Sequence, residues 1–188
     1  STHPLKNLNG LGDGGFITTD NKKLYDKIKL YRNHGMKSRD NVHVFGVNSR
    51  LDVLNAEVLN FRLKKLKSVI LKRKKNISIY QKLINQKYIK IPYDTKDIFS
   101  SSVIFLCLCE KRDELQKYLN TKNIQSLVYY GTPLHKHYAS KNIQFHKNKL
   151  PVSEKLAKKV LALPHHQNLT ENQIKKVCKE VNNFYKKF

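Results

Sequence analysis

A long amphipathic stretch between Leu51 and Asn85 most limits the folds that are open to this chain. Apolar residues recur in it at helical spacing, while the opposite side carries paired lysines and the run KRKK at 72–75. The apolar positions are Leu54, Val58, Phe61, Leu66, Val69, Ile70, Ile77, Tyr80 and Ile84. Because so long a helix is typical of one that links two domains or lies along a subunit interface, we expect a connecting helix over residues 51–87.

The residues after this stretch alternate between strand and helix patterns. The run SSVIFLCLC at 101–109 predicts a buried strand, residues 112–120 predict a helix, and QSLVYY at 125–130 predicts a second strand. Residues 153–164 predict a short helix with an extended exit. This order of elements favours a small α/β domain over residues 88–188.

The end of the chain predicts one more helix. Thr170 and Gln173 have the spacing of a capping box, in which each side chain bonds the other residue's backbone N–H. The expected core stripe of this helix is Ile174, Val177, Val181, Phe184 and Phe188.

The residues before the long stretch are irregular and rich in glycine at first. GFITTD at 15–20 predicts a short strand, and Asp20 is then placed to cap a helix over 21–33. Gly35 is the expected residue that ends this helix, and the polar residues 36–50 predict a long loop of the kind reserved for function. The predicted parts of the chain are therefore residues 1–50, 51–87 and 88–188.

The net charge of +23 raises the possibility of nucleic-acid binding. Lysine outnumbers arginine and is spread along the whole chain, and no zinc-finger, RNA-recognition or basic-zipper pattern is present. The KRKK run is open to both readings, a nucleic-acid patch or the solvated face of a helix. We favour a solvated basic surface, which can also attract an anionic substrate, and keep nucleic-acid binding as the alternative.

No apolar run is long enough for a membrane span, and no secretory or transit segment is visible. The three cysteines are an odd number without metal-type spacing, and two of them alternate on the predicted buried strand. We interpret them as reduced core residues and expect a cytoplasmic protein without a membrane partner.

Lys6 is the first residue with a candidate chemical role. A lysine that a protein uses is usually a Schiff-base former, a phosphate clamp or a general base. The phosphate-clamp motif needs its glycines before the lysine, whereas here they follow it. A Schiff-base lysine for pyridoxal phosphate needs a hydroxyl for the phosphate and a rigid approach, which Ser1 and Pro4 offer. By composition alone an ordinary exposed lysine is the alternative.

The blocks around these residues resemble one known family. STHPLKNLNGLGDGGFITT at the start, LYRNHG at 30–35, FGVNSRLDVLNAEVL at 45–59, YYGTPLH at 129–135 and the segment 154–185 occur in the order found in the DegT/DnrJ/EryC1/StrS sugar aminotransferases. The resemblance covers essentially the whole chain. It implies an α/β fold, the C-terminal portion of the aspartate aminotransferase fold (fold type I) that binds pyridoxal 5'-phosphate, with a small C-terminal α/β domain.

The resemblance implies roles for four residues near the start of the chain. Lys6 matches the lysine that binds the cofactor as a Schiff base and then moves a proton between substrate and cofactor. Ser1 matches the serine that holds the cofactor phosphate. Asn48 matches an asparagine that reaches the phosphate in the neighbouring subunit, which implies a homodimer with a shared active site. Arg50 is open between a contact to an anionic group and a salt bridge within its loop.

The same blocks place further candidates near the sugar. They are His3, His135 and His166, and the aromatic pair Tyr129 and Tyr130, each of which has an ordinary structural role as its alternative. No histidine pair has the spacing of a metal site, so no metal is expected. YYGTPLH is similar to members that act on 3-keto sugars of deoxythymidine diphosphate.

The family's aspartate that pairs with the pyridinium nitrogen lies upstream of the cofactor lysine, so it has no counterpart after Ser1. We therefore expect a C-terminal half: residues 1–50 would be the remnant of the large cofactor-binding domain, inactive alone. The expected reaction is transamination of a dTDP- or UDP-linked keto sugar, with L-glutamate as donor. The alternatives are an inactive fragment that serves in assembly and a nucleic-acid-binding protein.

Overall fold

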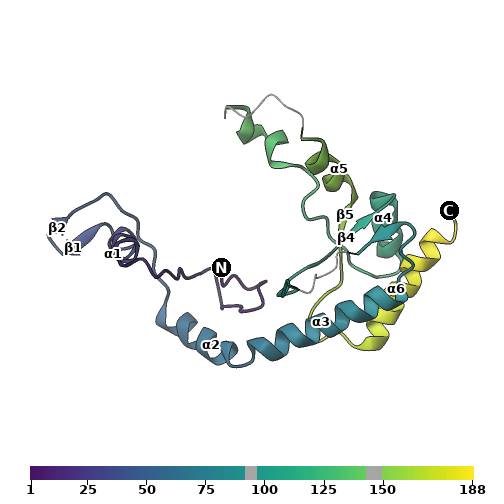
Figure 1. Cartoon of the computed structure of the whole chain (residues 1–188), viewed down its shortest axis with the longest axis horizontal. Coiled ribbons are helices and arrows are strands. Elements are labelled where there is room, and N and C mark those ends of the chain that lie inside the picture. Colours follow the sequence, from purple (N-terminus) through teal and green to yellow (C-terminus); the bar gives the residue numbers. More distant parts are fainter. Residues whose placement is uncertain (92–96, 143–149) are drawn as a thin grey trace. The chain divides into compact units, whose positions relative to one another are not determined.

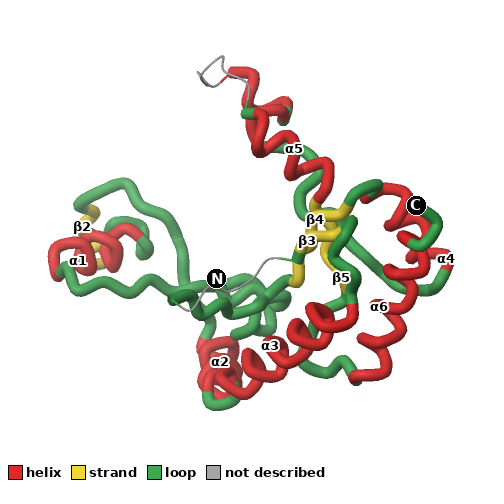
Figure 2. The backbone as a smooth tube through the Cα atoms, turned by 45° about the vertical axis from the view of Figure 1, so that its right-hand side comes forward, coloured by secondary structure: helices red, strands yellow, loops and turns green. Residues whose placement is uncertain are grey.

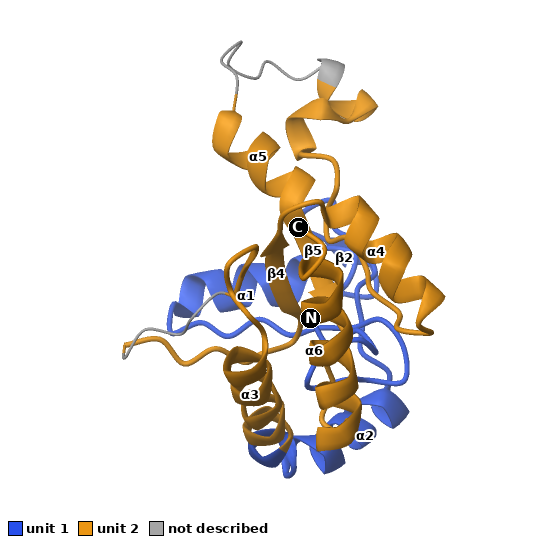
Figure 3. Ribbon diagram, turned by 90° about the vertical axis from the view of Figure 1, so that its right-hand side faces the viewer, with its two compact units in different colours: residues 1–68 blue, residues 69–188 orange. Residues whose placement is uncertain are grey.

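The computed structural model describes residues 1–91, 97–142 and 150–188. The chain divides into two compact units, residues 1–68 and residues 69–188, which Figure 3 distinguishes by colour. No helix in the described part of the chain is both long and apolar enough to cross a membrane.

The first unit contains α1 (Lys22–Tyr31), β1 (Met36–Ser38), β2 (Asn41–Val42) and α2 (Val53–Leu63), joined by long loops (Figure 2). The predicted helix over 21–33 is confirmed as α1. Its predicted cap is wrong, because Asn21 and not Asp20 has the extended N-cap backbone and accepts a hydrogen bond from the Leu24 N–H at 3.1 Å.

Gly35 follows the end of α1 but is not the residue that ends the helix, because the C-cap is Arg32, three residues earlier. Its φ of +69° lies in the left-handed region, and its N–H donates to the Leu30 carbonyl at 3.0 Å. A Cβ atom at this position would lie 1.7 Å from the Val44 carbonyl oxygen, so no other residue fits without moving the backbone.

Two further predictions for the first unit are wrong. Residues 15–20 form no strand, since no strand among the described residues pairs with them, and Phe16 and Ile17 are exposed. Residues 36–50 are not a loop throughout, because β1 and β2 pair antiparallel within them and Asn48 forms an isolated bridge with Asn33. Strand formation depends on a pairing partner, which a local residue pattern does not reveal.

The predicted connecting helix is two helices, α2 and α3 (Leu66–Leu83). Lys65 N–H donates to the Arg62 carbonyl three residues earlier, so the four-residue ladder of an α-helix is interrupted at this point. The boundary between the two compact units falls between residues 68 and 69, inside the first turn of α3. The helix pattern is continuous, but its two parts serve separate units, and the three-part division of the chain stays a prediction.

The second unit is built on a three-stranded antiparallel sheet in the order β3 (Ile89–Lys90), β4 (Phe105–Cys109), β5 (Val160–Leu163). Helices α3, α4 (Arg112–Thr121) and α6 (Glu171–Tyr185) contribute further core side chains beside it (Figure 1). Residues of β4 alternate between buried and half-buried, so one face of the sheet carries the core. This core face includes Phe105, Cys107, Cys109, Leu161 and Leu163.

Most predictions for the second unit are confirmed. The buried strand appears as β4, the helix over 112–120 as α4, and residues 153–164 as α5 (Pro151–Lys159) followed by β5. The capping box at Thr170 is present, and three free, buried cysteines lie in the core: Cys107, Cys109 and Cys178.

Two predictions for this unit are wrong. Residues 125–130 are not a regular strand, because only Leu127 pairs with β5, through a single bridge to Ala162. Phe188 lies beyond the end of α6 and is 52% exposed, with the Lys111 ammonium 3.5 Å from its ring centroid, so it is not part of the core stripe.

Candidate active site

Lys6 lies in an irregular loop at the start of the first unit, and backbone bonds close this loop. Thr2 N–H donates to the Gly14 carbonyl at 2.8 Å, and the Gly10 N–H donates to the Thr2 carbonyl at 2.7 Å. Thr2 is fully buried, which fixes the base of the loop. Lys6 therefore stands in a closed turn between two anchored ends.

Short-range bonds shape the turn that leads to Lys6. Ser1 Oγ accepts from the His3 N–H at 3.3 Å, His3 Nδ1 accepts from the Leu5 N–H at 3.1 Å, and the Lys6 N–H donates to the His3 carbonyl at 2.8 Å. Because Nδ1 is an acceptor here, the proton of a neutral His3 ring belongs on Nε2, which lies 3.8 Å from Asp13. In this state His3 organises the turn, and a contact to substrate stays a prediction.

The Lys6 side chain is exposed. Among the residues that the structure describes, its ammonium group makes no hydrogen bond and no ion pair. An ion pair would hold the ammonium form, whereas an unpaired lysine that has lost its proton can attack a carbonyl compound. The geometry therefore leaves Lys6 available to a ligand.

Helix α2 holds the far arm of this loop, residues 9–11, by side-chain hydrogen bonds. The sequence interpretation missed this feature. Asn55 Oδ1 accepts from the Leu11 N–H at 2.9 Å, and Arg62 donates to the carbonyl of Asn9. Asn55 and Arg62 are seven positions apart and therefore share one face of α2, and that spacing was the available signal.

Asn48 and Arg50 lie on a second loop of the same unit, and both are exposed. Asn48 pairs with Asn33 through backbone bridging, and Arg50 Nη2 donates to the Asn33 side-chain oxygen at 2.8 Å. Arg32 braces the same loop by donating from Nε to the Ser49 carbonyl at 2.8 Å. Arg50 thus has a polar partner within its own unit, and a role with an anionic ligand is a prediction.

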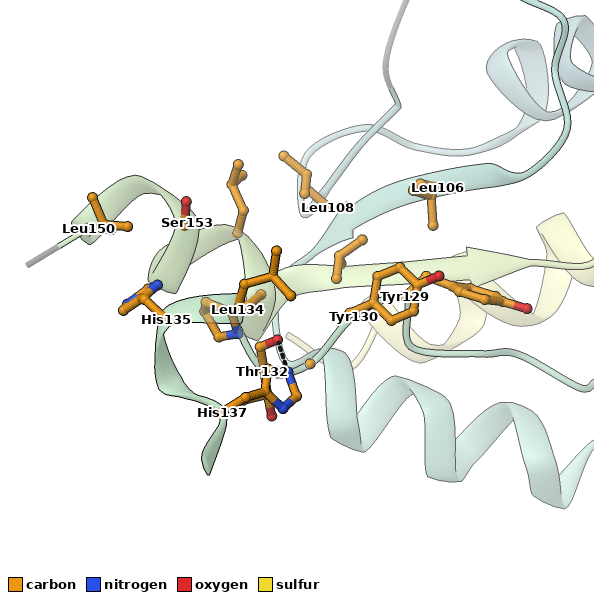
Figure 4. A pocket seen from close by; sticks show the side chains of 15 residues that line it. Leu106, Leu108, Tyr129, Tyr130, Thr132, Leu134, His135, His137, Leu150 and Ser153 are labelled. Atoms are coloured by element: carbon orange, nitrogen blue, oxygen red, sulfur yellow. Dashed lines mark hydrogen bonds between the residues drawn. The ribbon is translucent and has the colours of Figure 1, made fainter. Parts of the chain in front are cut away.

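Three of the predicted substrate residues line one pocket in the second unit. This pocket of about 1030 Å³ lies on the face of the sheet opposite the core, where Leu106 and Leu108 form its floor (Figure 4). Tyr129, Tyr130 and His135 contribute to its wall. The two tyrosine rings meet edge to face, with centroids 5.5 Å apart. The structure therefore brings these three predicted residues to the same apolar cavity.

His135 is held by an acidic residue that the sequence interpretation did not identify. Glu154, at the start of α5, lies 3.2 Å from His135 Nε2 through one oxygen and 2.7 Å from Lys136 Nζ through the other. The hydrogen bonds from Lys136 and then from His135 lower the pKa of this carboxyl. The chain has only 14 acidic residues against 37 basic ones, so an acid beside a predicted site residue is a signal that the sequence offers.

His166 lies outside this pocket, on an exposed turn before α6. Its Nδ1 accepts from the Asn168 N–H at 3.2 Å, and its carbonyl accepts from Asn76 at 2.9 Å. Its neighbour His165 is more deeply placed and donates from Nε2 to the Ser102 carbonyl at 2.9 Å. Burial lowers the pKa of His165 to about 4, against a smaller opposing effect of the bond to Ser102.

Comparison with known proteins identifies a single family. The chain matches the model of the DegT/DnrJ/EryC1/StrS aminotransferase family over residues 1–182. It is 34% identical to a pleiotropic regulatory protein of Geobacillus stearothermophilus, over 100% of this chain and 51% of that protein. It is 32% identical to the dTDP-3-amino-3,6-dideoxy-alpha-D-galactopyranose transaminase of Aneurinibacillus thermoaerophilus, over 91% of this chain and 47% of that protein.

The comparison with solved structures leads to the same family as the comparison of sequences. The structure of DesV from S. venezuelae, in complex with a ketimine intermediate, superposes with a TM-score of 0.91 at 31% identity, over 97% of this chain and 50% of that one. The predicted fold class, a C-terminal portion of fold type I, is confirmed. The chain spans about half the length of the curated relatives that it matches.

Proposed function

Because the chain belongs to the DegT/DnrJ/EryC1/StrS aminotransferase family, we propose that it supplies the cofactor lysine and part of the substrate site of a sugar aminotransferase. The observation that carries this proposal is Lys6, an exposed lysine with an available amine in a closed, anchored loop. The proposed reaction moves an amino group from L-glutamate to a nucleotide-activated keto sugar, through pyridoxal 5'-phosphate.

The residues near Lys6 fit this cofactor. A hydroxyl, that of Ser1, lies on the same turn and accepts a hydrogen bond from the His3 N–H, which leaves its proton free to donate. Thr2 Oγ1 is buried without a hydrogen-bond partner among the described residues, so this turn also holds an unsatisfied polar group. When bound, pyridoxal phosphate supplies an electron sink for a carbanion next to nitrogen.

The chain's own residues then have distinct tasks. The amine of Lys6 would bind the cofactor and, when free, would take a proton from the substrate carbon and return one. The Ser1 hydroxyl donates to the phosphate. Asn48 reaches the phosphate of a second copy in a homodimer. The neighbouring Phe45 is 99% exposed, which leaves this aromatic side chain open to a second copy, while backbone bonds hold its loop against the end of α1.

The relatives and the pocket in the second unit support the proposed substrate class. The Aneurinibacillus relative is named for an amino sugar carried on dTDP. For this chain we propose a dTDP- or UDP-linked keto sugar as the substrate. The tyrosine pair and His135 offer aromatic faces and a polar ring at the wall of the pocket, a combination that suits a sugar or a base.

An absorbance scan with pyridoxal phosphate tests the role of Lys6. The natural gene product that contains this chain should show the visible band of a lysine-bound cofactor, and Lys6→Ala should abolish it. Lys23→Ala, an exposed lysine on α1, is the matched control and should retain the band. A band that survives Lys6→Ala would rule out the assignment, and the 188 residues alone should retain the cofactor weakly.

A further inference from the structure

The loop that carries Lys6 contains no helix or strand, so its shape depends on individual bonds to the rest of the first unit. Its near arm is tied by Thr2, and its far arm, residues 9–11, lies against α2. We propose that Asn55 and Arg62 on α2 are positioning residues that fix the place of the Lys6 amine. This inference rests on the proposed role of Lys6.

Asn55 and Gly10 fit one another closely. Asn55 is half-buried, and its Oδ1 accepts from the Leu11 N–H at 2.9 Å. A Cβ atom on Gly10 would lie 2.5 Å from that same oxygen. The amide of Asn55 thus occupies the space that a side chain at residue 10 would need, and it holds the backbone that follows this glycine.

Arg62 donates to the backbone carbonyls that precede Leu11. Its Nη1 donates to the Asn9 carbonyl at 2.5 Å and lies 3.4 Å from the Gly10 carbonyl. Because a guanidinium is planar and always charged, it fixes the direction of the carbonyls that it bonds more strictly than an ammonium group does. Arg62 is half-buried, which limits the competition from water for these bonds.

The two residues act on the loop from one rigid surface. They are seven positions apart, which is two turns of a helix, so both lie on the same face of α2. They bind three consecutive residues, 9–11, next to the Gly10 N–H that closes the loop on Thr2. Loss of either contact frees the far anchor of the turn, and the position of Lys6 then becomes less defined.

A displacement of the Lys6 amine should lower the rate of its reaction with the cofactor strongly and the free energy of unfolding little. A misplacement of about 1 Å between reacting groups can cost on the order of a hundredfold in rate. Thr2 and Gly10 are buried, but the contacts of this loop with Asn55 and Arg62 are polar, so their loss removes little buried apolar surface. We therefore expect a rate defect in the folded protein without a matching loss of fold.

Borohydride trapping measures this position directly, because it fixes the cofactor by a stable bond to the amine that holds it. The natural gene product that contains this chain is mixed with pyridoxal phosphate and reduced, and peptide masses give the rate of label on Lys6 for each folded molecule. Asn55→Ala and Arg62→Ala should slow this rate by about tenfold or more. Asn55→Asp, which keeps an acceptor for the Leu11 N–H, should restore most of it.

Asn60→Ala is the matched control, since Asn60 is an exposed asparagine on the same helix. It should trap as the unchanged protein does. Equal trapping in Asn55→Ala, Arg62→Ala and the control would overturn the positioning role alone. A slow rate that Asn55→Asp does not restore, or one fully explained by unfolding in circular dichroism, would also overturn it. No label on Lys6 in the unchanged protein would overturn the proposed function, and the positioning role with it.

Discussion

Acidification should destabilise the second unit through His165. The ring donates from Nε2 to the Ser102 carbonyl, which fixes the neutral tautomer with its lone pair on Nδ1. Nδ1 is buried, and among the described residues it has no hydrogen-bond partner. A proton on Nδ1 would place a charge in this site, and the nearby positive charge of Arg73 opposes it further. These effects explain why the pKa of His165 is lowered to about 4.

The sign of the pH effect follows from which state binds the proton. Between pH 6.5 and pH 4 the unfolded chain protonates this histidine, whereas the folded chain does not. The contribution of neutral His165 to the free energy of unfolding is therefore present above pH 6.5 and is lost as the pH falls toward 4. With these two pKa values, the loss from pH 7 to pH 5 is about 2 kcal/mol.

Urea unfolding at pH 7, 6 and 5, followed by circular dichroism, measures this loss. His165→Gln keeps an amide that can donate to Ser102 but does not titrate, so its free energy of unfolding should fall by about 2 kcal/mol less over the same range. The other histidines and the acids are common to both proteins and cancel in the difference. Parallel pH curves for the two proteins, or an NMR titration of His165 near pH 6.5, would refute the reasoning.

Three further predictions concern stability and reactivity. Gly35→Ala should destabilise the first unit by more than about 1 kcal/mol, because its φ is positive and the new Cβ would overlap the Val44 carbonyl; thermal unfolding measures this. Thr170→Ala should cost about 1 kcal/mol through loss of the capping box with Gln173, whereas Thr170→Ser should cost little in the same assay. Burial raises the pKa of the three thiols, those of Cys107, Cys109 and Cys178. The folded protein should therefore resist iodoacetamide until urea unfolds it, and rapid labelling of any of these thiols in the native chain would contradict this.

The parts of the fold that the sequence predicted are those set by local patterns. The capping box and apolar stripe of α6 depend on residues three or four positions apart, and the alternation in β4 depends on every second residue. The wrong strands at 15–20 and 125–130 have suitable residues, but a strand also needs a partner from a distant part of the chain. β3, with only two paired residues, left no recognisable pattern at all.

The site divides in the same way. Lys6 and Ser1 belong to a contiguous motif, and the sequence was sufficient to identify both the family and the candidate lysine. The bonds that hold these residues join positions far apart, such as Arg62 to Asn9 and Glu154 to His135. No spacing rule links such pairs, because folding alone brings them together.

By itself, then, the sequence determined the order of the elements, the family and the position of the candidate lysine. The tertiary structure decided where the long helix is interrupted, which helix face anchors the Lys6 loop and which face of the sheet carries a pocket. The reason is physical: helix periods, caps and motifs are encoded in neighbouring residues, whereas packing and long-range hydrogen bonds depend on where the whole chain places each group.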